Sequence, residues 1–318
     1  MHLRSITPLS PSPCTTPVPS VPGAPASGPA AAGGTWRMVA AMALSGTIGL
    51  LVVESGLPVL LVVWLRCAFG AMGLAAWVLW SRQWAAPRAA EWAWMLAGGM
   101  ALVLNWVCLF RAYHYSGIAV ATVVYHTQPF LLLVLAALFQ GEALPLRRLP
   151  WLLLALLGVV LSSGLAGQAP GQALPWTGIG LALLAAALYA VATLATQRLR
   201  RLAPAQIAMW QMLMGVVLLA VPAWSVWSAP GAAAFSLRAG VSVLILGLVH
   251  TAWMYVLMYA AFQRLPAQAI AGLSFIYPAI ALLVDLAWFG TRPQPAQWLG
   301  MGLILGAVWA YRRTPATR

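Results

Sequence analysis

The stretch of sequence that decides the fold is RAYHYSGIAVATVVYHTQPFLLLVLAALFQGE, residues 111–142. It is an apolar run with polar groups in its first half, a proline at its middle and a glycine near its end. The stretch AAFQRLPAQAIAGLSFIYPAIALLVDLAWFGT, residues 260–291, has the same order of features at an offset of 149 residues, and Pro129 falls on Pro278. The repeated order of short loop, long helix, central proline and glycine stop indicates an internal duplication, more than the few identities do.

The composition identifies the class of protein. Only 7% of the residues are charged and 63% are hydrophobic, which is too little charge for the surface of a soluble domain. Apolar runs of about 20 residues recur along the chain, each long enough to cross about 30 Å of hydrocarbon. Because these runs are continuous and do not alternate, a transmembrane β-barrel is excluded. The composition predicts an all-α polytopic membrane protein in contact with the lipid bilayer.

The apolar runs predict ten transmembrane helices. They cover residues 36–53, 58–80, 91–111, 117–140, 149–166, 176–197, 204–227, 238–261, 267–289 and 296–312. The loops between them are short, so that no extramembrane domain carries separate chemistry.

Three segments outside these runs divide the chain. Residues 1–35 are rich in Pro, Ala and Ser, and we expect them to form a disordered tail, or to precede an alternative start at Met38. The linker GQAPGQALP, residues 167–175, separates a first repeat over 36–166 from a second repeat over 176–312. Each repeat therefore holds five predicted spans.

The arginines predict the orientation, because cytoplasmic loops of membrane proteins are enriched in basic residues. With the N-terminus in the cytoplasm, 13 of the 17 basic residues, all of them arginines, fall on cytoplasmic segments, including the tail over 313–318. Three lie at outer ends: Arg111, Arg238 and Arg292. We therefore expect a bacterial-type inner membrane protein with both termini in the cytoplasm. The same bias accounts for the net charge of +13, so that no nucleic-acid partner is expected.

The odd number of spans in each repeat has a consequence for function. A second copy of a five-span unit must enter the membrane in the opposite orientation to the first. Such inverted repeats are typical of secondary transporters, which bind their cargo near the midplane of the membrane and alternate access to it.

Six stretches carry a resemblance to a known family. They are GLPVLLVVWLR (56–66), LFRAYHYSGIAVATVVYHTQPF (109–130), FQGEAL (139–144), LLLALLGVVLSSG (152–164), YAAFQRLPAQAIAGLSFIYPAIALL (259–283) and LGMGLILGAVWA (299–310). In order and spacing they resemble the ten-span permeases of the drug/metabolite transporter superfamily, which have two EamA domains. The chain departs from the pattern in three places: Thr291 follows the second glycine stop, Met212 stands opposite Arg66, and Asp285 is unexpected.

The resemblance implies transport of a small molecule, which in this superfamily is an amino acid, another metabolite, a nucleotide sugar or a toxic organic compound. It also implies that spans one to four and six to nine line a central cavity. Spans five and ten would then lie at the periphery, where a homodimer contact could form.

Charged and titratable groups inside a span are candidates for function, because burying them in the bilayer is costly. Arg66 lies about 12 Å and Asp285 about 6 Å below the outer end of its span at the helical rise per residue. Long side chains could bridge this gap, so we expect an ion pair between the repeats that closes the outer side or holds a cargo carboxylate. The alternative is a structural pair, or side chains that reach the interface. His126 and His250 lie near mid-membrane and could relay protons or bind cargo; the alternative is a hydrogen-bonded histidine within the bundle.

Polar side chains at helical spacing extend this set. The candidate cargo-contacting residues are Arg66, Asn105, Thr122, Tyr125, His126, Gln128, Gln211, His250, Ser274, Tyr277 and Asp285. The alternative is that these groups join helices by hydrogen bonds. Pro129 and Pro278 are predicted hinges, because a proline within a helix removes a backbone hydrogen bond. No metal site and no cofactor is expected.

The sequence thus predicts a secondary transporter that moves a small metabolite, such as an amino acid, or an organic toxin by alternating access, in the direction of efflux. A phosphate-binding motif of the GxxxxGK[ST] type is absent from the sequence, which disfavours ATP as the driving force. The alternatives are a channel or a structural membrane protein, and, with less support, an intramembrane enzyme.

Overall fold

The computed structural model describes residues 29–163, 175–229, 235–290 and 293–315, and every regular element in these ranges is a helix. The elements are α1 (Pro29–Gly46), α2 (Ile48–Ser55), α3 (Val59–Trp80), α4 (Ala89–Tyr125), α5 (Gln128–Gln140), η1 (Leu146–Arg148), α6 (Leu149–Ser162), α7 (Trp176–Arg198), α8 (Pro204–Trp227), α9 (Leu237–Gly247), η3 (Leu248–Trp253), α10 (Met254–Phe262), α11 (Ala267–Leu273), α12 (Ile276–Phe289) and α13 (Pro295–Arg313).

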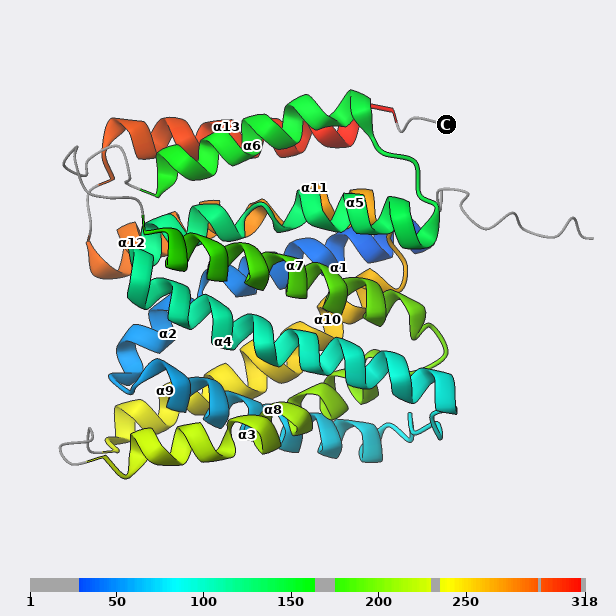
Figure 1. Ribbon diagram of the computed structural model, residues 1–318, viewed down its shortest axis with the longest axis vertical. Coiled ribbons are helices and arrows are strands. Elements are labelled where there is room, and N and C mark those ends of the chain that lie inside the picture. Colours follow the sequence, from blue (N-terminus) through cyan, green and yellow to red (C-terminus); the bar gives the residue numbers. More distant parts are fainter. Residues whose placement is uncertain (1–28, 164–174, 230–234, 291–292, 316–318) are drawn as a thin grey trace, which may run out of the picture.

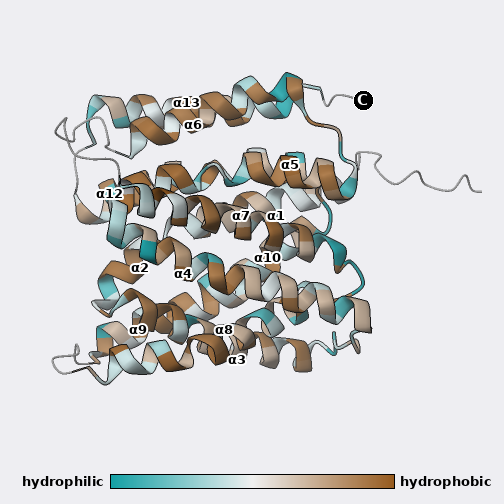
Figure 2. Ribbon diagram, viewed as in Figure 1, coloured by the Kyte–Doolittle hydropathy of each residue, from teal (hydrophilic) through white to brown (hydrophobic). Residues whose placement is uncertain are grey.

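The long helices lie roughly side by side, and their connections gather at the two ends of the bundle (Figure 1). Helices α6 and α13 pack together along one edge, while α3, α8 and α9 lie at the opposite edge. Between these edges, α4 packs against α7 and α1 against α10 and α12. Hydrophobic residues cover most of the helices, and hydrophilic residues concentrate at the connecting segments (Figure 2).

Eight helical segments of the described residues are long and apolar enough to cross a membrane. They are Ala32–Ser55, Val59–Trp80, Ala89–Ile118, Val120–Gln140, Trp176–Arg198, Pro204–Trp227, Leu237–Phe262 and Ala267–Phe289. Where the structure describes them, the ten predicted runs fall on helices, and residues 164–166 of the fifth run lie outside the described residues; α6, with 14 residues, and α13 are not among the eight segments. Eight of the ten predicted spans are therefore supported by length and composition.

One predicted boundary is wrong. Helix α1 begins at Pro29, so that residues 29–35, expected in the disordered tail, are helical. Proline is tolerated in the first turn of a helix, where its missing N–H has no helical partner, and alanines follow it. The predicted separation of the third and fourth spans is confirmed: α4 holds two helices that meet at a kink at Gly117, with φ 75°, and the membrane-crossing segments on its two sides are Ala89–Ile118 and Val120–Gln140. Predicted segments 1–28 and 167–174 lie outside the described residues.

The two stretches from which the duplication was inferred break at equivalent places. Helix α4 gives way to α5 around His126 and Thr127, and α11 gives way to α12 around Ser274 and Phe275. A proline follows each break, at the second residue of α5 and at the third residue of α12. Because proline cannot donate the backbone hydrogen bond that would continue the preceding helix, the break falls just before it.

The glycine stops are also equivalent. Gly141 and Gly290 end α5 and α12 with φ of 69° and 63°, the left-handed conformation that glycine adopts most easily. Helix α7 runs antiparallel to α1, so that the second half of the described chain starts from the opposite end of the bundle to the first (Figure 1).

Candidate functional site

A buried arginine forms the centre of the candidate site. Arg66 lies on α3 with only 7% of its surface exposed. Its Nε donates a hydrogen bond to Thr251 Oγ1 at 3.0 Å, and its Nη2 lies 3.4 Å from the carbonyl oxygen of His250. The guanidinium carbon stands 5.6 Å from the ring centroid of Trp106 on α4, a cation–π arrangement. All of these partners are neutral acceptors or rings, so none of them balances the charge of Arg66.

A π-helical turn presents the groups that face Arg66. Residues Leu248–Trp253 form this turn between α9 and α10. Within it, Thr251 Oγ1 donates to the carbonyl oxygen of Leu246 at 2.8 Å, five residues earlier. The extra residue of a π-turn rotates the side chains that follow it, and such turns are frequent at functional sites. Thr251 and the carbonyl of His250 are thereby directed to α3.

The imidazole of His250 contacts the first span, whereas the backbone carbonyl of the same residue faces Arg66. Its Nε2 lies 2.8 Å from Thr47 Oγ1, and its Nδ1 lies 3.4 Å from the carbonyl oxygen of Ile245. Thr47 stands at the break between α1 and α2. The π-turn therefore connects the interrupted first span with Arg66 on the second.

The second predicted histidine lies at the helix breaks. His126 is buried, and its ring is stacked on Tyr277 with centroids 4.9 Å apart and lies 6.2 Å from Phe275. Its Nδ1 lies 2.6 Å from the carbonyl oxygen of Thr122 one turn earlier. His126 and Phe275 hold equivalent places in the two repeats, so the two breaks face each other across the halves of the chain.

Four buried or half-buried tyrosines form two ring pairs within the bundle. The rings of Tyr125 and Tyr189 lie 6.2 Å apart, and those of Tyr255 and Tyr259 lie 5.3 Å apart. The hydroxyl of Tyr259 donates to Gln211 Oε1, and the hydroxyl of Tyr189 to the sulfur of Met258 at 3.4 Å. These side chains come from α4, α7, α8 and α10, so that both halves contribute.

Several buried polar atoms of the site have no hydrogen-bond partner within the described residues. They are Asn105 Oδ1, His126 Nε2, Gln128 Nε2, Trp210 Nε1 and Gln211 Nε2. A buried polar group without a partner costs about 1–3 kcal/mol, and native proteins keep few of them. Such atoms on α4, α5 and α8 are candidates for hydrogen bonds to a bound molecule.

Two predicted cargo-contacting residues, Ser274 and Asp285, make only local contacts or lie exposed. Ser274 is buried, and its hydroxyl donates to the carbonyl of Ala271 at 2.8 Å within its own helix. Asp285 is exposed on α12 and forms no ion pair with Arg66, so the expected ion pair is wrong. The π-turn, which the sequence did not reveal, occupies the side of Arg66 where we expected a carboxylate. Pro129 is buried and Pro278 half-buried, each beside its helix break.

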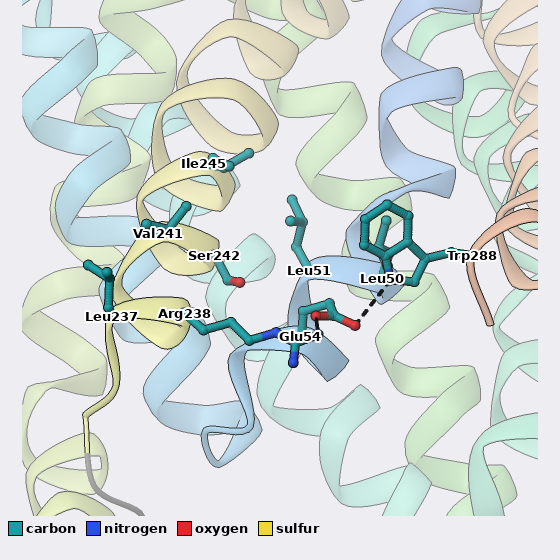
Figure 3. A pocket seen from close by; sticks show the side chains of 9 residues that line it. All are labelled: Leu50, Leu51, Glu54, Leu237, Arg238, Val241, Ser242, Ile245 and Trp288. Atoms are coloured by element: carbon teal, nitrogen blue, oxygen red, sulfur yellow. Dashed lines mark hydrogen bonds and ion pairs between the residues drawn. The ribbon is translucent and has the colours of Figure 1, made fainter.

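Ion pairs stand at both ends of the bundle. At one end, Glu54 near the end of α2 pairs with Arg238 in the first turn of α9 and accepts a hydrogen bond from Trp288 Nε1 at 3.1 Å (Figure 3). A pocket of about 590 Å³ adjoins them. Its other lining residues are Leu50, Leu51, Leu237, Val241, Ser242 and Ile245. The arginine distribution predicts this to be the outer end.

At the opposite end, Glu91 in the first turn of α4 pairs with Arg201, which follows α7. Arg201 Nε donates to Glu91 Oε1 at 2.8 Å, and Arg201 Nη2 donates to the carbonyl oxygen of Ala86 at 2.8 Å. The hydrogen bond to Glu91 raises the pKa of the Arg201 guanidinium further above its usual range. The described residues hold no group of three His, Cys, Asp or Glu side chains that could bind a metal ion.

Glu142 ties the end of α5 to the start of α11. Its Oε1 accepts a hydrogen bond from the backbone N–H of Ala267 at 3.3 Å, and its Oε2 is buried without a partner among the described residues. Burial raises the pKa of this carboxyl above its usual range, while the N–H groups of Ala267 and Gln268 and the charge of Arg200 act in the opposite direction.

Sequence reasoning missed Thr47, Thr251, Tyr189 and Phe275. Thr251 lies next to His250 in the chain, but an uninterrupted α-helix would present it at a different angle. Phe275 could have been found, because it stands opposite His126 at the offset of 149 residues. Tyr189 and Thr47 carry no spacing signal of their own.

Comparisons with known proteins agree with this architecture. The model of the EamA-like transporter family matches residues 34–164 and again residues 176–312. The chain is 31% identical over 278 residues to the uncharacterized transporter YxxF of Bacillus subtilis, covering 86% of this chain and 87% of that protein. It is 30% identical over 195 residues to the probable terminal-alkyne amino-acid exporter of Streptantibioticus cattleyicolor, covering 60% of this chain and 63% of that one.

A solved crystal structure superposes with a TM-score of 0.78 over 88% of this chain and 98% of its own, at 20% identity, which shows a shared fold. The family model thus covers both halves of the chain, and a relative above 30% identity extends along most of its length. The chain belongs to the EamA-like transporter family, membrane transporters of the drug/metabolite type.

Proposed function

We propose that the protein is a secondary carrier that exports a small cargo bearing a carboxylate, an amino acid or a related compound, across the inner membrane. The single observation that carries this proposal is the buried Arg66, which faces neutral groups from α4 and the π-turn. The likeness to a relative named as an amino-acid exporter supports both the direction and the class of cargo.

The charge of Arg66 favours an anionic cargo. A buried cation costs several kcal/mol unless an anion or strong hydrogen bonds compensate for the lost water. Thr251 and the carbonyl of His250 compensate in part. A cargo carboxylate that accepts two parallel hydrogen bonds from the guanidinium would complete the compensation. The same charge repels organic cations, so that amino acids are favoured over cationic toxins.

The remaining groups of the site suit the rest of such a cargo. Asn105 Oδ1 and His126 Nε2 are buried acceptor or donor atoms without partners among the described residues. The rings of Tyr125, Tyr189 and Tyr255 offer apolar and weakly polar walls from both halves. In this proposal Arg66 fixes the cargo carboxylate, while the tyrosines and His126 contact the amino group and the side chain.

The mechanism that we propose is alternating access by two inverted repeats of five spans each, with α6 and α13 as the fifth and tenth. The antiparallel course of α1 and α7, the equivalent breaks before Pro129 and Pro278, and the equivalent glycine stops support it. In this scheme the helix breaks act as hinges, because a broken backbone hydrogen-bond ladder bends at low cost.

Counterflow in proteoliposomes tests the proposal. Vesicles loaded with unlabelled amino acids are diluted into labelled amino acid, and a carrier accumulates label transiently and saturably. Thermal unfolding with a panel of amino acids and organic cations identifies the ligand, and we expect stabilisation by amino acids. Unsaturable flux would support a channel, and stabilisation by organic cations alone would overturn the carboxylate cargo.

A further inference from the structure

The ion pairs at the two ends of the bundle occupy equivalent places in the two repeats. Glu54 closes the first span and Arg201 follows the sixth, 147 residues later. Glu91 opens the third span and Arg238 opens the eighth, again 147 residues later. Each pair joins the end of the first helix of one half to the start of the third helix of the other half.

The charges of the two pairs are exchanged. The first helix of the first half ends with a glutamate, Glu54, whereas the first helix of the second half is followed by an arginine, Arg201. Glu91 lies in the first turn of α4 and Arg201 lies beyond the end of α7, where the helix dipoles favour these signs. Glu54 near the end of α2 and Arg238 in the first turn of α9 carry the signs that the dipoles disfavour.

Additional hydrogen bonds between the halves reinforce the Glu91 end. Gln206 both donates to the carbonyl of Ala85 at 2.7 Å and accepts from its N–H at 3.1 Å. Arg198 Nη2 donates to the carbonyl oxygen of Phe139 at 2.7 Å. At the Glu54 end the equivalent position to Phe139 is Trp288, whose indole is bonded to Glu54 itself.

We propose that Glu54, Arg238 and Trp288 form an outer latch, and Glu91 and Arg201 an inner latch, which open in turn during transport, with the outer latch the weaker of the two. This inference rests on the proposed carrier function and names the positioning residues of its two gates. Both latches are closed in this structure, in agreement with a central site whose polar groups are buried.

The pocket beside the outer latch supports its role as an exit. Its lining residues come from α2, α9 and α12, the elements that the latch joins (Figure 3). Ser242 and Ile245 extend the pocket along α9 in the direction of the π-turn. When Glu54 and Arg238 separate, the pocket becomes continuous with the space between the halves, and Ser242, 5% exposed, gains access to water.

Thiol labelling of Ser242→Cys tests the latches without knowledge of the cargo. The native cysteines are replaced by alanine, the full chain is reconstituted, and a membrane-impermeant maleimide is added outside. We expect slow labelling in this background and labelling about two- to fivefold faster with Glu54→Gln or Arg238→Gln, the scale of one partly exposed ion pair. The exchanged pair Glu54→Arg with Arg238→Glu should return the rate to the background or below, because it gives the outer latch the signs of the inner one.

Variants of the inner latch are the matched control. Glu91→Gln and Arg201→Gln remove the equivalent pair, and we expect Ser242→Cys to be labelled no faster than in the background, because opening the inner end keeps the outer end closed. Unchanged labelling in both outer variants would overturn the latch and leave a static brace, visible only as a lower unfolding temperature. Equal acceleration by inner and outer variants would overturn the alternation. Because no cargo is added, neither result depends on whether the cargo is a carboxylate.

Discussion

At the scale of single residues, the candidate site is centred on a buried cation, Arg66, whose contacts bring no negative charge. Arg66 was a candidate because a charged group within a span is costly, and the structure buries it. The expected partner Asp285 is exposed, and Thr251, His250 and Trp106 surround the guanidinium. Depth along two helices can be counted from a sequence, but the direction in which each helix faces depends on how it packs.

Replacing Arg66 distinguishes a cargo anchor from a structural group. Arg66→Met removes a buried cation without an anionic partner and keeps the volume, so the unfolding temperature should stay the same or rise. Apparent affinity for a carboxylate cargo should fall about 10- to 100-fold, the worth of hydrogen bonds to a charged group. The apparent affinity of Arg66→Lys should lie between those of the parent and Arg66→Met, because lysine keeps the charge and loses the forked geometry of the guanidinium. A lower unfolding temperature with unchanged transport would assign Arg66 a structural role.

Glu142 gives a prediction for pH. Its pKa is raised by burial, so the folded protein holds this proton more tightly than the unfolded chain. The associated stability is present below the unfolded pKa and is lost as the pH rises through the higher folded pKa. Arg200 and Tyr311 are the ionisable groups that interact with it.

We therefore expect Glu142→Gln to unfold a few degrees higher than the parent at neutral pH, and the difference to disappear below about pH 4. Intrinsic tryptophan fluorescence on heating measures it. A difference that stays constant over this range would contradict the assignment.

At the scale of elements, the sequence located the helices and the interruptions beside Pro129 and Pro278, and missed the π-turn. The ends of α3 and α8 fall within a residue of the predicted spans, because long apolar runs and flanking prolines define them. The breaks before Pro129 and Pro278 follow from proline chemistry. The π-turn over residues 248–253 has no such signal, because packing against α3, where Gly70 and Gly247 approach closely, fixes it.

The contact between α6 and α13 depends on glycine, and a matched pair of variants tests it. A Cβ at Gly300 would lie 2.5 Å from the carbonyl oxygen of Gly158 and 2.5 Å from Ser162 Oγ, whereas a Cβ at Gly302 on the same helix would meet open space. Gly300→Ala should destabilise the protein by about 1–3 kcal/mol. Gly302→Ala should be neutral or slightly stabilising, because alanine favours helix. Equal unfolding temperatures of the two variants would contradict this prediction and show that α6 and α13 can move apart without loss of stability.

At the scale of the whole molecule, both halves of the chain contribute side chains to the candidate site. Arg66 comes from the first half and its hydrogen-bond partners from the second, and the ring of His126 from the first half stacks on that of Tyr277 from the second. The ion pairs at both ends also cross between the halves. Movement of one half relative to the other would therefore change the site and the ends together.

Accessibility of single cysteines tests the orientation. Gln83 and Ser228 are exposed at opposite ends of the bundle, after α3 and after α8. In a background without native cysteines, we expect an impermeant maleimide to label Ser228→Cys on intact cells. Gln83→Cys should react only after permeabilisation. The reverse pattern would place both termini outside the cytoplasm.

The sequence by itself determined the class of protein, the positions of the apolar helices, the duplication and the family, because each depends on local composition or on the order of motifs along the chain. The tertiary structure decided which groups meet: the π-turn that faces Arg66, the stacking of His126 on Tyr277, and the exchanged ion pairs at the two ends. The physical reason is that membrane insertion follows the hydropathy of each segment. The rotation and contacts of each helix follow from packing between segments distant in the chain.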